Sequence, residues 1–179
     1  MRTSIRQLAV AGILAVLMIP ATAAPSFGRA TGEPVLSVRG AGPYRIGMSL
    51  DRLAAAGLVT DVWSYPGCDD VVGSGATGEW AGVILLRFRA GRLADIGTAT
   101  RPPRSPAGAA VGMEFSELEE IYGRRGELVR SASGQTGYLV RVGQRVELFT
   151  DHPIRSGVGY FQVGPADFVE RTFRTGTAC

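Results

Sequence analysis

His152 is the only histidine of the chain, and it stands directly after Asp151. An Asp-His pair can supply a general base when the carboxylate orients the imidazole, but the scheme also needs a nucleophile or a metal nearby. Side chains that are neighbours on a turn usually point apart. We therefore interpret Asp151 and His152 as exposed turn residues that could contact a partner. The rival hypothesis is a small secreted hydrolase that uses His152 with Asp151 or with the carboxylates of Asp69 and Asp70.

Other common catalytic and cofactor patterns are weak or missing. The chain has no G-x-S-x-G sequence, and S-x-x-K is excluded because it contains no lysine. The pair Asp69-Asp70 fits no calcium loop, so we expect no metal site and no cofactor. Residues 73–78 match G-x-G-x-x-G, which binds a dinucleotide only between a strand and a helix. A strand is predicted over 80–88 instead, and we interpret 73–78 as a flexible loop.

Three aromatic residues offer a candidate binding patch. Trp63 and Tyr65 lie in a loop-rich region after the first predicted helix, and Trp80 follows at the start of a predicted strand. Exposed aromatic side chains often anchor interfaces. Core packing is the alternative for each of them. We favour the core for Trp80 and the surface for Trp63.

The first 23 residues have the pattern of a secretory signal peptide. Two arginines precede an apolar run over residues 8–19, and Ala21 and Ala23 are the small residues that a signal peptidase recognises. The run is shorter than the roughly 20 residues of a membrane span. Cleavage after Ala23 would release a secreted, extracellular chain with no membrane span.

Loss of that segment changes the charge of the chain. The sequence has 19 basic and 16 acidic side chains, and removing Arg2 and Arg6 leaves 17 basic ones. A nearly neutral chain lacks the clustered basic surface that nucleic acid requires. Nucleic acid is therefore not an expected partner.

The two cysteines, Cys68 and Cys179, form an even number in a chain predicted to be exported. We predict a disulfide between them. It would close a loop of about 110 residues and contribute roughly 4–5 kcal/mol to stability. Two free thiols or a metal site remain alternatives, although a cysteine-only zinc site needs four ligands.

Two short segments repeat each other at an interval of 65 residues, RIGMSLDRL from Arg45 and AVGMEFSEL from Ala110. Each is predicted to lead into a short amphipathic helix, over 50–57 and over 115–122. We expect the repeated glycines to hold a backbone shape that a side chain would block, and the methionines to fill the core beneath each helix. These residues are Gly47, Met48, Gly112 and Met113.

Extended segments follow each helix and indicate an α+β fold. It consists of two tandem units of a helix plus an antiparallel sheet, with the helices packed on one face of the sheet. Strands are predicted over 80–88, 93–98, 127–130, 137–142, 144–150 and 157–163. Residues 166–170 could form a last helix or an edge strand. The predicted organisation is a signal peptide over 1–23, a flexible leader over 24–34, a first repeat unit over 35–100, a Pro-rich linker over 101–108 and a second repeat unit over 109–179.

The repeated pattern resembles a known family. Ile46-Gly47-Met48 is followed by the segment 88–93, and Val111-Gly112-Met113 is followed by the hairpin segment 149–154. This is similar to the tandem repeat of the bacterial β-lactamase inhibitor protein family and to single-repeat outer-membrane assembly lipoproteins of the SmpA/OmlA type. Similar secreted proteins of GC-rich bacteria share the Gly-x-Gly-Pro sequence that precedes the first copy. The resemblance implies a fold, and no inhibitor contact residue is carried over.

These observations favour a secreted, non-enzymatic binding protein. It would contact another protein or a cell-envelope component through its sheet face and through loops near Trp63, Tyr65, Asp151 and His152. The small hydrolase that uses His152 is the alternative hypothesis.

Overall fold

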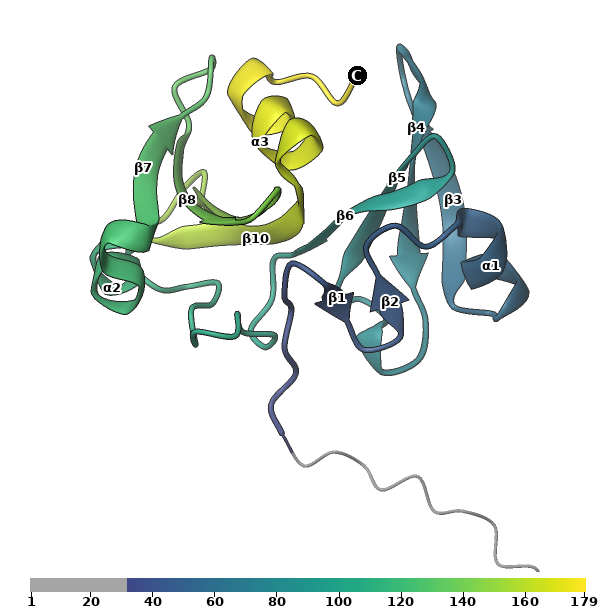
Figure 1. Ribbon diagram of the computed structural model, residues 1–179, viewed down its shortest axis with the longest axis horizontal. Coiled ribbons are helices and arrows are strands. Elements are labelled where there is room, and N and C mark those ends of the chain that lie inside the picture. The colour runs from purple at the N-terminus through teal and green to yellow at the C-terminus, as the bar shows by residue number, and fades with distance from the viewer. Residues whose placement is uncertain (1–31) are drawn as a thin grey trace, which may run out of the picture. The chain divides into compact units, whose positions relative to one another are not determined.

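The fold is built around one eight-stranded antiparallel sheet. A computed structural model of the chain describes residues 32–179 (Figure 1). The predicted signal peptide and the leader up to residue 31 lie outside the described residues. The elements are β1 (Gly40–Ala41), β2 (Tyr44–Arg45), α1 (Leu50–Ala55), β3 (Val59–Tyr65), β4 (Cys68–Ala76), the 3-10 turn η1 (Gly78–Trp80), β5 (Leu85–Arg89), β6 (Arg92–Thr98), α2 (Phe115–Tyr122), the 3-10 turn η2 (Gly123–Arg125), β7 (Gly126–Arg130), β8 (Thr136–Val142), β9 (Arg145–Asp151), β10 (Val158–Pro165) and α3 (Ala166–Thr175).

The strand order is β3-β4-β5-β6-β10-β9-β8-β7. Each half of the sheet is therefore an antiparallel meander of four strands, and the two meanders meet where β6 pairs with β10. At this seam Phe161 pairs with Thr98 and Val163 with Ile96. The predicted α+β class with a mainly antiparallel sheet is confirmed.

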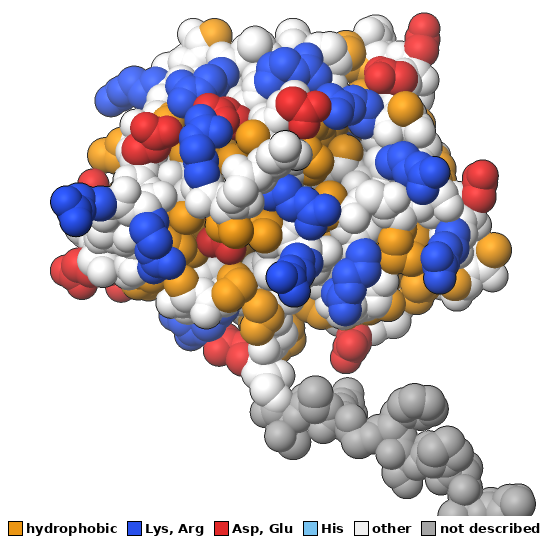
Figure 2. All heavy atoms as spheres, viewed as in Figure 1, with side chains coloured by type: hydrophobic (Ala, Val, Ile, Leu, Met, Phe, Trp, Pro, Cys, Tyr) orange, Lys and Arg blue, Asp and Glu red, His pale blue; other side chains and the backbone are white. Residues whose placement is uncertain are grey.

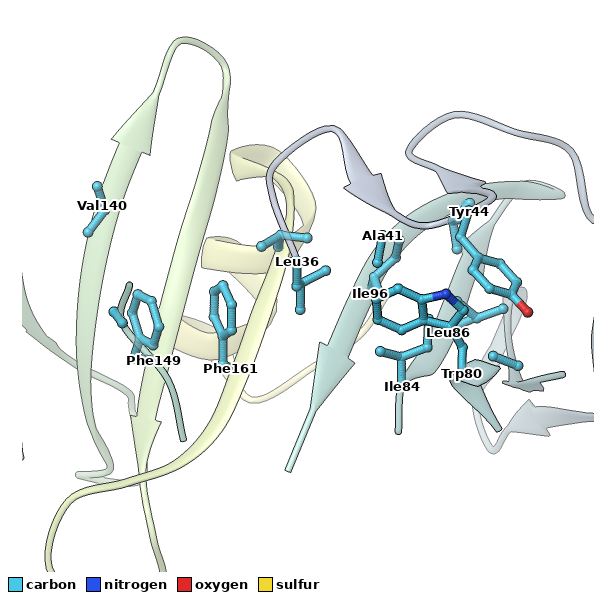
Figure 3. Close-up of a cluster of buried hydrophobic side chains, with 14 of the residues drawn as sticks. Leu36, Ala41, Tyr44, Trp80, Ile84, Leu86, Ile96, Val140, Phe149 and Phe161 are labelled. Atoms are coloured by element: carbon cyan, nitrogen blue, oxygen red, sulfur yellow. The ribbon is translucent and has the colours of Figure 1, made fainter. Parts of the chain in front are cut away.

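One side of the sheet, here called the first face, carries the larger core. Alternate strand residues such as Phe88, Ile96 and Phe161 point to it, because successive strand side chains alternate between faces. The rings of Phe149 and Phe161 stack with centroids 4.3 Å apart. Figure 3 shows these rings on one side of Leu36 and the cluster around Trp80 on the other. Trp80 is 6% exposed, so its predicted core position is confirmed.

Helices α1 and α2 both cover the first face. Leu53 of α1 and Leu118 of α2 are fully buried in the same cluster of side chains. Ser49 caps α1 by accepting a hydrogen bond from the Arg52 N–H at 3.3 Å. Helix α2 ends at Tyr122 and is followed by Gly123, whose positive φ of 52° suits glycine.

Helix α3 lies on the opposite side, here called the second face. Its buried residues Phe168, Val169 and Phe173 pack against Leu139 and Leu148 of the second meander. The prediction that the helices share one face is therefore wrong for α3. The undecided segment 166–170 is the start of this helix.

The two Gly-Met pairs make the same backbone contacts in the two halves. In each, the glycine N–H donates to the carbonyl of one strand residue, and the N–H of that strand residue donates to the methionine carbonyl. The bonds are Gly47 N–H to Leu93 O (2.7 Å), Leu93 N–H to Met48 O (2.8 Å), Gly112 N–H to Val158 O (2.8 Å) and Val158 N–H to Met113 O (2.8 Å). Both methionines pack against the core of the first face, as expected for core residues.

The region between the first helix and residue 85 differs from the sequence prediction. Strands β3 and β4 replace the expected loops, and Gly73 and Gly75 lie within β4 as part of the sheet. Residues 80–84 lie in a turn outside the strand, and β5 begins only at Leu85. The expected linker runs beside the end of the leader, where the Arg104 N–H donates to the Pro34 carbonyl at 3.1 Å.

Candidate functional site

On the second face, α3 packs against the second meander and shares its cluster with Cys68 and Val71 of β4. The side chains of Trp63 and Leu85 are not part of that cluster and lie on the parts of this face that belong to β3 and β5. Trp63 lies there, 37% exposed, with its indole ring directly over Gly73 of the neighbouring strand. A Cβ atom on Gly73 would lie 2.3 Å from the ring, so only glycine allows this flat placement. Leu85 is 50% exposed on the same face. The predicted surface position of Trp63 is confirmed.

A second aromatic ring lies flat on the sheet at its seam. Tyr160 of β10 lies over Gly97 of β6, where a Cβ atom would be 2.0 Å from the tyrosine hydroxyl oxygen. Trp63 and Tyr160 thus cover glycines on two separate strands of the second face. Large rings on a sheet surface with no side chain beneath them provide broad, rigid contact area.

An ion pair lies between the two rings. Arg87 of β5 and Asp95 of β6 pair across the ladder, and the Arg87 Nε–H donates to Asp95 Oδ2 at 2.8 Å. The Arg87 Nη2 group donates to the same carboxylate oxygen and to Gln162 Oε1 at 3.1 Å. The guanidinium also stacks over the Phe168 ring of α3, 5.3 Å from its centroid. The pair therefore connects both meanders and the helix.

Burial shifts the pKa values of Asp95, Arg87 and Tyr160. It raises the pKa of Asp95, and the charge of Arg87 and its hydrogen bond oppose that rise. Burial disfavours the cationic form of Arg87, but Asp95 outweighs it and raises the pKa of the guanidinium. The pKa of Tyr160 is raised, first by burial and then by the charge of Asp95, so its hydroxyl remains a proton donor at neutral pH.

These side chains line a hollow of about 410 Å³ between the first meander, β10 and α3. We call it the polar hollow and define it by Tyr65, Arg87, Asp95, Tyr160, Gln162 and Thr172. Two atoms of its lining residues, Asp95 Oδ1 and Thr172 Oγ1, have no hydrogen-bond partner among the described residues. Both atoms are fully buried beneath neighbouring groups, so they do not face the open part of the hollow.

A second, more apolar hollow of about 620 Å³ adjoins the polar hollow. Trp63 lines it together with Val83 and the exposed side chain of Leu85, and Leu85 also lines the polar hollow. Polar and apolar groups of the second face are therefore available side by side. This combination is typical of ligand sites.

The structure separates the residues that the sequence proposed for binding. Trp63 and Tyr65 belong to the second face, but Asp151 and His152 do not line either hollow. The His152 ring bonds within its own turn, where its Nδ1 accepts from the Ile154 N–H at 3.2 Å. Asp151 Oδ2 accepts from the Thr136 N–H at 3.1 Å. Neither bond orients the imidazole toward a nucleophile.

The other sequence candidates carry no assembled chemistry. Asp69 and Asp70 are both exposed. Within residues 32–179, no group of three or more His, Cys, Asp or Glu side chains could hold a metal ion. Residues 73–76 are part of β4 and lead into a 3-10 turn, so the dinucleotide pattern has no helix behind it, and its interpretation as a flexible loop is also wrong.

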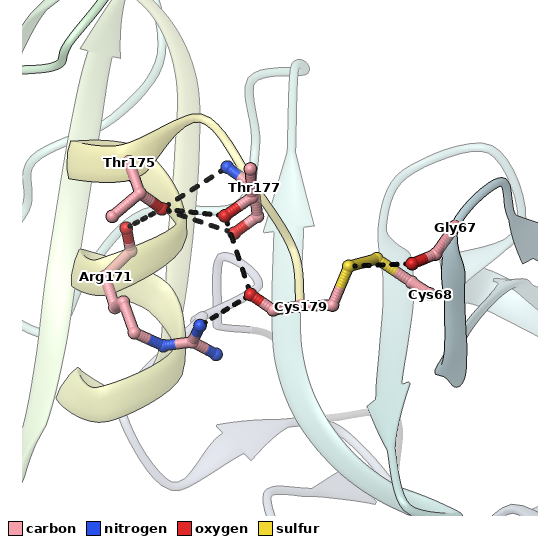
Figure 4. The surroundings of a disulfide bond; sticks show 6 residues. All are labelled: Gly67, Cys68, Arg171, Thr175, Thr177 and Cys179. Carbon is pink, nitrogen blue, oxygen red and sulfur yellow. Dashed lines mark hydrogen bonds between the residues drawn. A yellow bond between two sulfur atoms is a disulfide. The ribbon is translucent and has the colours of Figure 1, made fainter.

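A disulfide joins Cys68 at the start of β4 to Cys179 at the C-terminus, which confirms the predicted pairing (Figure 4). The last residues run from the end of α3 toward the first meander, and the Arg171 guanidinium donates to the Cys179 carbonyl at 2.8 Å. Gly176 in this segment lines the polar hollow. The disulfide therefore fixes one wall of the hollow.

Sequence reasoning missed Arg87, Asp95, Tyr160 and Gln162. The one local signal is that Arg87 lies between the apolar residues Leu86 and Phe88. Because side chains alternate along a strand, Arg87 faces the side of the sheet opposite to these buried neighbours. Its partner in the ladder depends on register, which the sequence alone does not reveal.

Comparison of the chain with protein-family models, curated proteins and solved structures finds no match. Among the described residues, no helix combines the length and the apolar character needed to cross a membrane.

Proposed function

We propose that the chain is a secreted, non-enzymatic binding protein that takes up its partner on the second face of the sheet. The observation that carries the proposal is the uncovered area beside α3, where Trp63 and Leu85 are exposed next to the polar hollow. Exposed aromatic and aliphatic side chains that adjoin polar groups are common at binding sites. The partner is another protein or a component of the cell envelope.

Export and charge are consistent with this role. The predicted signal peptide would send the chain out of the cytoplasm. The Cys68–Cys179 disulfide is stable in the oxidising environment outside it. Figure 2 shows basic side chains spread over the visible face, with acidic ones between them. Such a mixed surface gives no preference for a polyanion.

We further propose that the two meanders are copies of one unit. The strand partners Leu93 and Val158 are 65 residues apart, which is also the interval between Met48 and Met113. Each half has one helix on the first face followed by four strands. The fold is then the one implied by the resemblance to the β-lactamase inhibitor protein family, with α3 added on the second face.

The binding role is tested by capturing partners from envelope and culture-medium fractions of the producing bacterium on the immobilised chain. Trp63→Ala and Leu85→Ser should weaken capture of any specific partner at least about tenfold, because an exposed aromatic anchor contributes on the order of 2 kcal/mol. Leu128→Ser is the matched control, since Leu128 is 54% exposed but lies on β7 at the other edge of the sheet.

Quantitative mass spectrometry of the bound fraction provides the measurement. Equal capture by the wild type and the Trp63 and Leu85 variants would contradict a partner site on the second face. Loss of capture by Leu128→Ser alone would place the site at the opposite edge.

A further inference from the structure

A third hollow lies on the first face, between the expected linker and the second meander. Its volume is about 440 Å³, and we call it the linker hollow. Its main lining residues are Val38, Ala107, Tyr122, Arg125, Val140 and Glu147. Tyr122 and Val140 belong to the core of the first face, and Glu147 pairs with Val140 across the ladder, so its side chain points to the same face. None of these residues lines the two hollows of the second face.

Glu147 supplies a buried carboxylate to the linker hollow. The residue is 4% exposed, and its Oε2 atom accepts a hydrogen bond from the Tyr122 hydroxyl at 2.6 Å. Its Oε1 atom accepts no hydrogen bond from residues 32–179. The unpaired side-chain atoms that the fold closes off from solvent in this range are Trp80 Nε1, Asp95 Oδ1 and Thr172 Oγ1, and Oε1 is not among them. Oε1 therefore stays open to solvent, and a molecule in the hollow can donate to it.

Arg125 supplies the opposite charge. Its exposed guanidinium lies over the Tyr122 ring, 5.5 Å from the centroid, and its Nε–H donates to the Tyr122 carbonyl at 3.4 Å. Its Nη1 group donates to no atom of the described residues. Arg125 and Glu147 belong to none of the ion pairs in this part of the chain. The hollow therefore holds an anion and a cation that do not neutralise each other by contact.

Burial makes the charge of Glu147 costly for the fold. It raises the pKa of this carboxyl group, and the hydrogen bond from Tyr122 and the charge of Arg125 only oppose the rise. Arg141 also lines the hollow, but its guanidinium is paired with Glu170 of α3 at 2.7 Å. A cationic group bound at Oε1 would stabilise the carboxylate, because a buried charge is tolerated when it is paired.

These charges select a ligand that carries both signs. An anion without a cationic group would be repelled by Glu147, and a cation without an anionic group would be repelled by Arg125. A zwitterion can place its ammonium group at Glu147 and its carboxylate at Arg125, whose planar guanidinium matches the geometry of a carboxylate. Val38, Ala107 and Val140 make the rest of the wall apolar. That wall suits an aliphatic or aromatic side chain.

We propose that the linker hollow binds a free amino acid with an apolar side chain, with its ammonium group donating to Glu147 Oε1 and its carboxylate accepting from Arg125. The volume of about 440 Å³ lies within the usual range of small-ligand pockets, roughly 300–1,000 Å³. This site goes beyond the partner surface proposed above, because it lies on the opposite face of the sheet and shares no residue with it.

The test titrates the full chain with L-alanine, L-valine, L-leucine, L-proline and L-phenylalanine up to roughly 10 mM, the weak end of specific binding. Binding is measured by calorimetry and located by amide shifts in NMR spectra. The N-acetyl and amide derivatives of the best-binding amino acid each lack one of its two charges. Each derivative should bind at least about tenfold more weakly, because it loses one charge-assisted contact.

Glu147→Gln and Arg125→Gln should each weaken binding of the amino acid at least about tenfold. The matched controls are Glu120→Gln and Arg124→Gln, the same changes at exposed positions that do not line the hollow. Glutamine at position 147 keeps an acceptor for Tyr122. If Glu147→Gln fails to fold, Arg125→Gln decides together with the two derivatives, since Arg125 is exposed.

An amino acid that binds the wild type and both controls equally, and both variants of the hollow more weakly, supports the proposal. Equal binding of either derivative, a loss in only one of the two variants, or amide shifts confined to the second face would overturn it. Failure of every amino acid would also overturn it. Capture of a partner that depends on Trp63 would then leave the function proposed for the second face intact.

Discussion

Glu147 is a carboxyl group buried in the core of the first face and only 4% exposed. The Tyr122 hydroxyl lies 2.6 Å from Glu147 Oε2 and 2.7 Å from Ser105 Oγ. Burial raises the pKa of Glu147, while the hydrogen bond from Tyr122 and the charge of Arg125 oppose the rise. The folded chain therefore favours the protonated carboxyl more than the unfolded chain does.

This shift predicts a pH-dependent effect of Glu147→Gln. A group whose pKa is raised on folding stabilises the fold fully below its ordinary pKa, about 4.3 for glutamate, and loses that contribution as pH rises through the raised value. Glutamine keeps the acceptor for Tyr122 without the charge. Urea unfolding should give equal free energies for variant and wild type near about pH 4 and a relative gain for Glu147→Gln near about pH 7.

Glu170 on α3 provides a control of opposite sign. Burial raises the pKa of Glu170, but hydrogen bonds from Arg174 and Arg141 outweigh burial and lower it. Its contribution is present above the ordinary glutamate pKa and is lost on acidification. Glu170→Gln should thus lose stability relative to wild type at neutral pH, and a loss of the same sign in Glu147→Gln would show that Glu147 is stabilising as a carboxylate.

At the scale of elements, the Gly-Met pairs are the contacts that fix each helix to its sheet. Gly47 and Gly112 have φ values of 95° and 83°, and a Cβ atom at either position would meet no other atom within 4 Å. Substitution by alanine should therefore cost only the backbone strain of a positive φ, about 1–2 kcal/mol. If the halves are copies of one unit, Gly47→Ala and Gly112→Ala should have equal costs in urea unfolding.

The control is Gly32→Ala, because Gly32 lies free of other atoms at an ordinary backbone angle and should tolerate alanine without cost. A substantial cost in one half and none in the other would show that the two motifs constrain the backbone differently. That result would count against the duplication.

The elements could be predicted from the sequence where local signals were strong. The amphipathic spacing of apolar residues predicted α1 and α2, and the extended segments after the second helix predicted the strands that follow α2. Strands β3 and β4 were missed because β4 contains Asp69, Asp70, Gly73 and Gly75, residue types with low strand propensity. The conformation of β4 depends on its pairing with β5 and on the Trp63 ring that lies over Gly73. Both are tertiary contacts.

The same limit applies to the site. Trp63 and Tyr65 were recognisable as exposed or interfacial aromatics, whereas Arg87 and Asp95 become a pair only through the register of β5 and β6, which contains a bulge at that point. Asp151 and His152 are adjacent in sequence, but Asp151 bonds to Thr136 of β8 while His152 bonds within its own turn. Adjacent positions in the sequence therefore suggested a functional pair that the fold does not form. The residues of the polar hollow are distant in sequence, and only the fold brings them together.

For the molecule as a whole, the disulfide holds α3 and the C-terminal residues across the second face. Cys68 and Cys179 are 111 residues apart, so in the unfolded chain the disulfide closes a loop that contains the residues of β4 to β10 and α3. Loop-closure entropy for a loop of this length amounts to about 4–5 kcal/mol. Helix α3 also has its own contacts, because Phe168, Val169 and Phe173 are buried against the second meander.

These two contributions are separated by the double variant Cys68→Ala, Cys179→Ala. We expect its free energy of unfolding in urea to fall by about 4 kcal/mol, and wild type with reductant to fall equally, while reductant leaves the double variant unchanged. Amide hydrogen exchange should show α3 still protected below the unfolding transition, because its apolar side keeps the helix docked. A loss of less than about 1 kcal/mol in the free energy of unfolding would mean that the unfolded chain gains little freedom when the disulfide is absent. Loss of exchange protection in α3 alone would mean that the disulfide, and not the buried phenylalanines, keeps the helix beside the polar hollow.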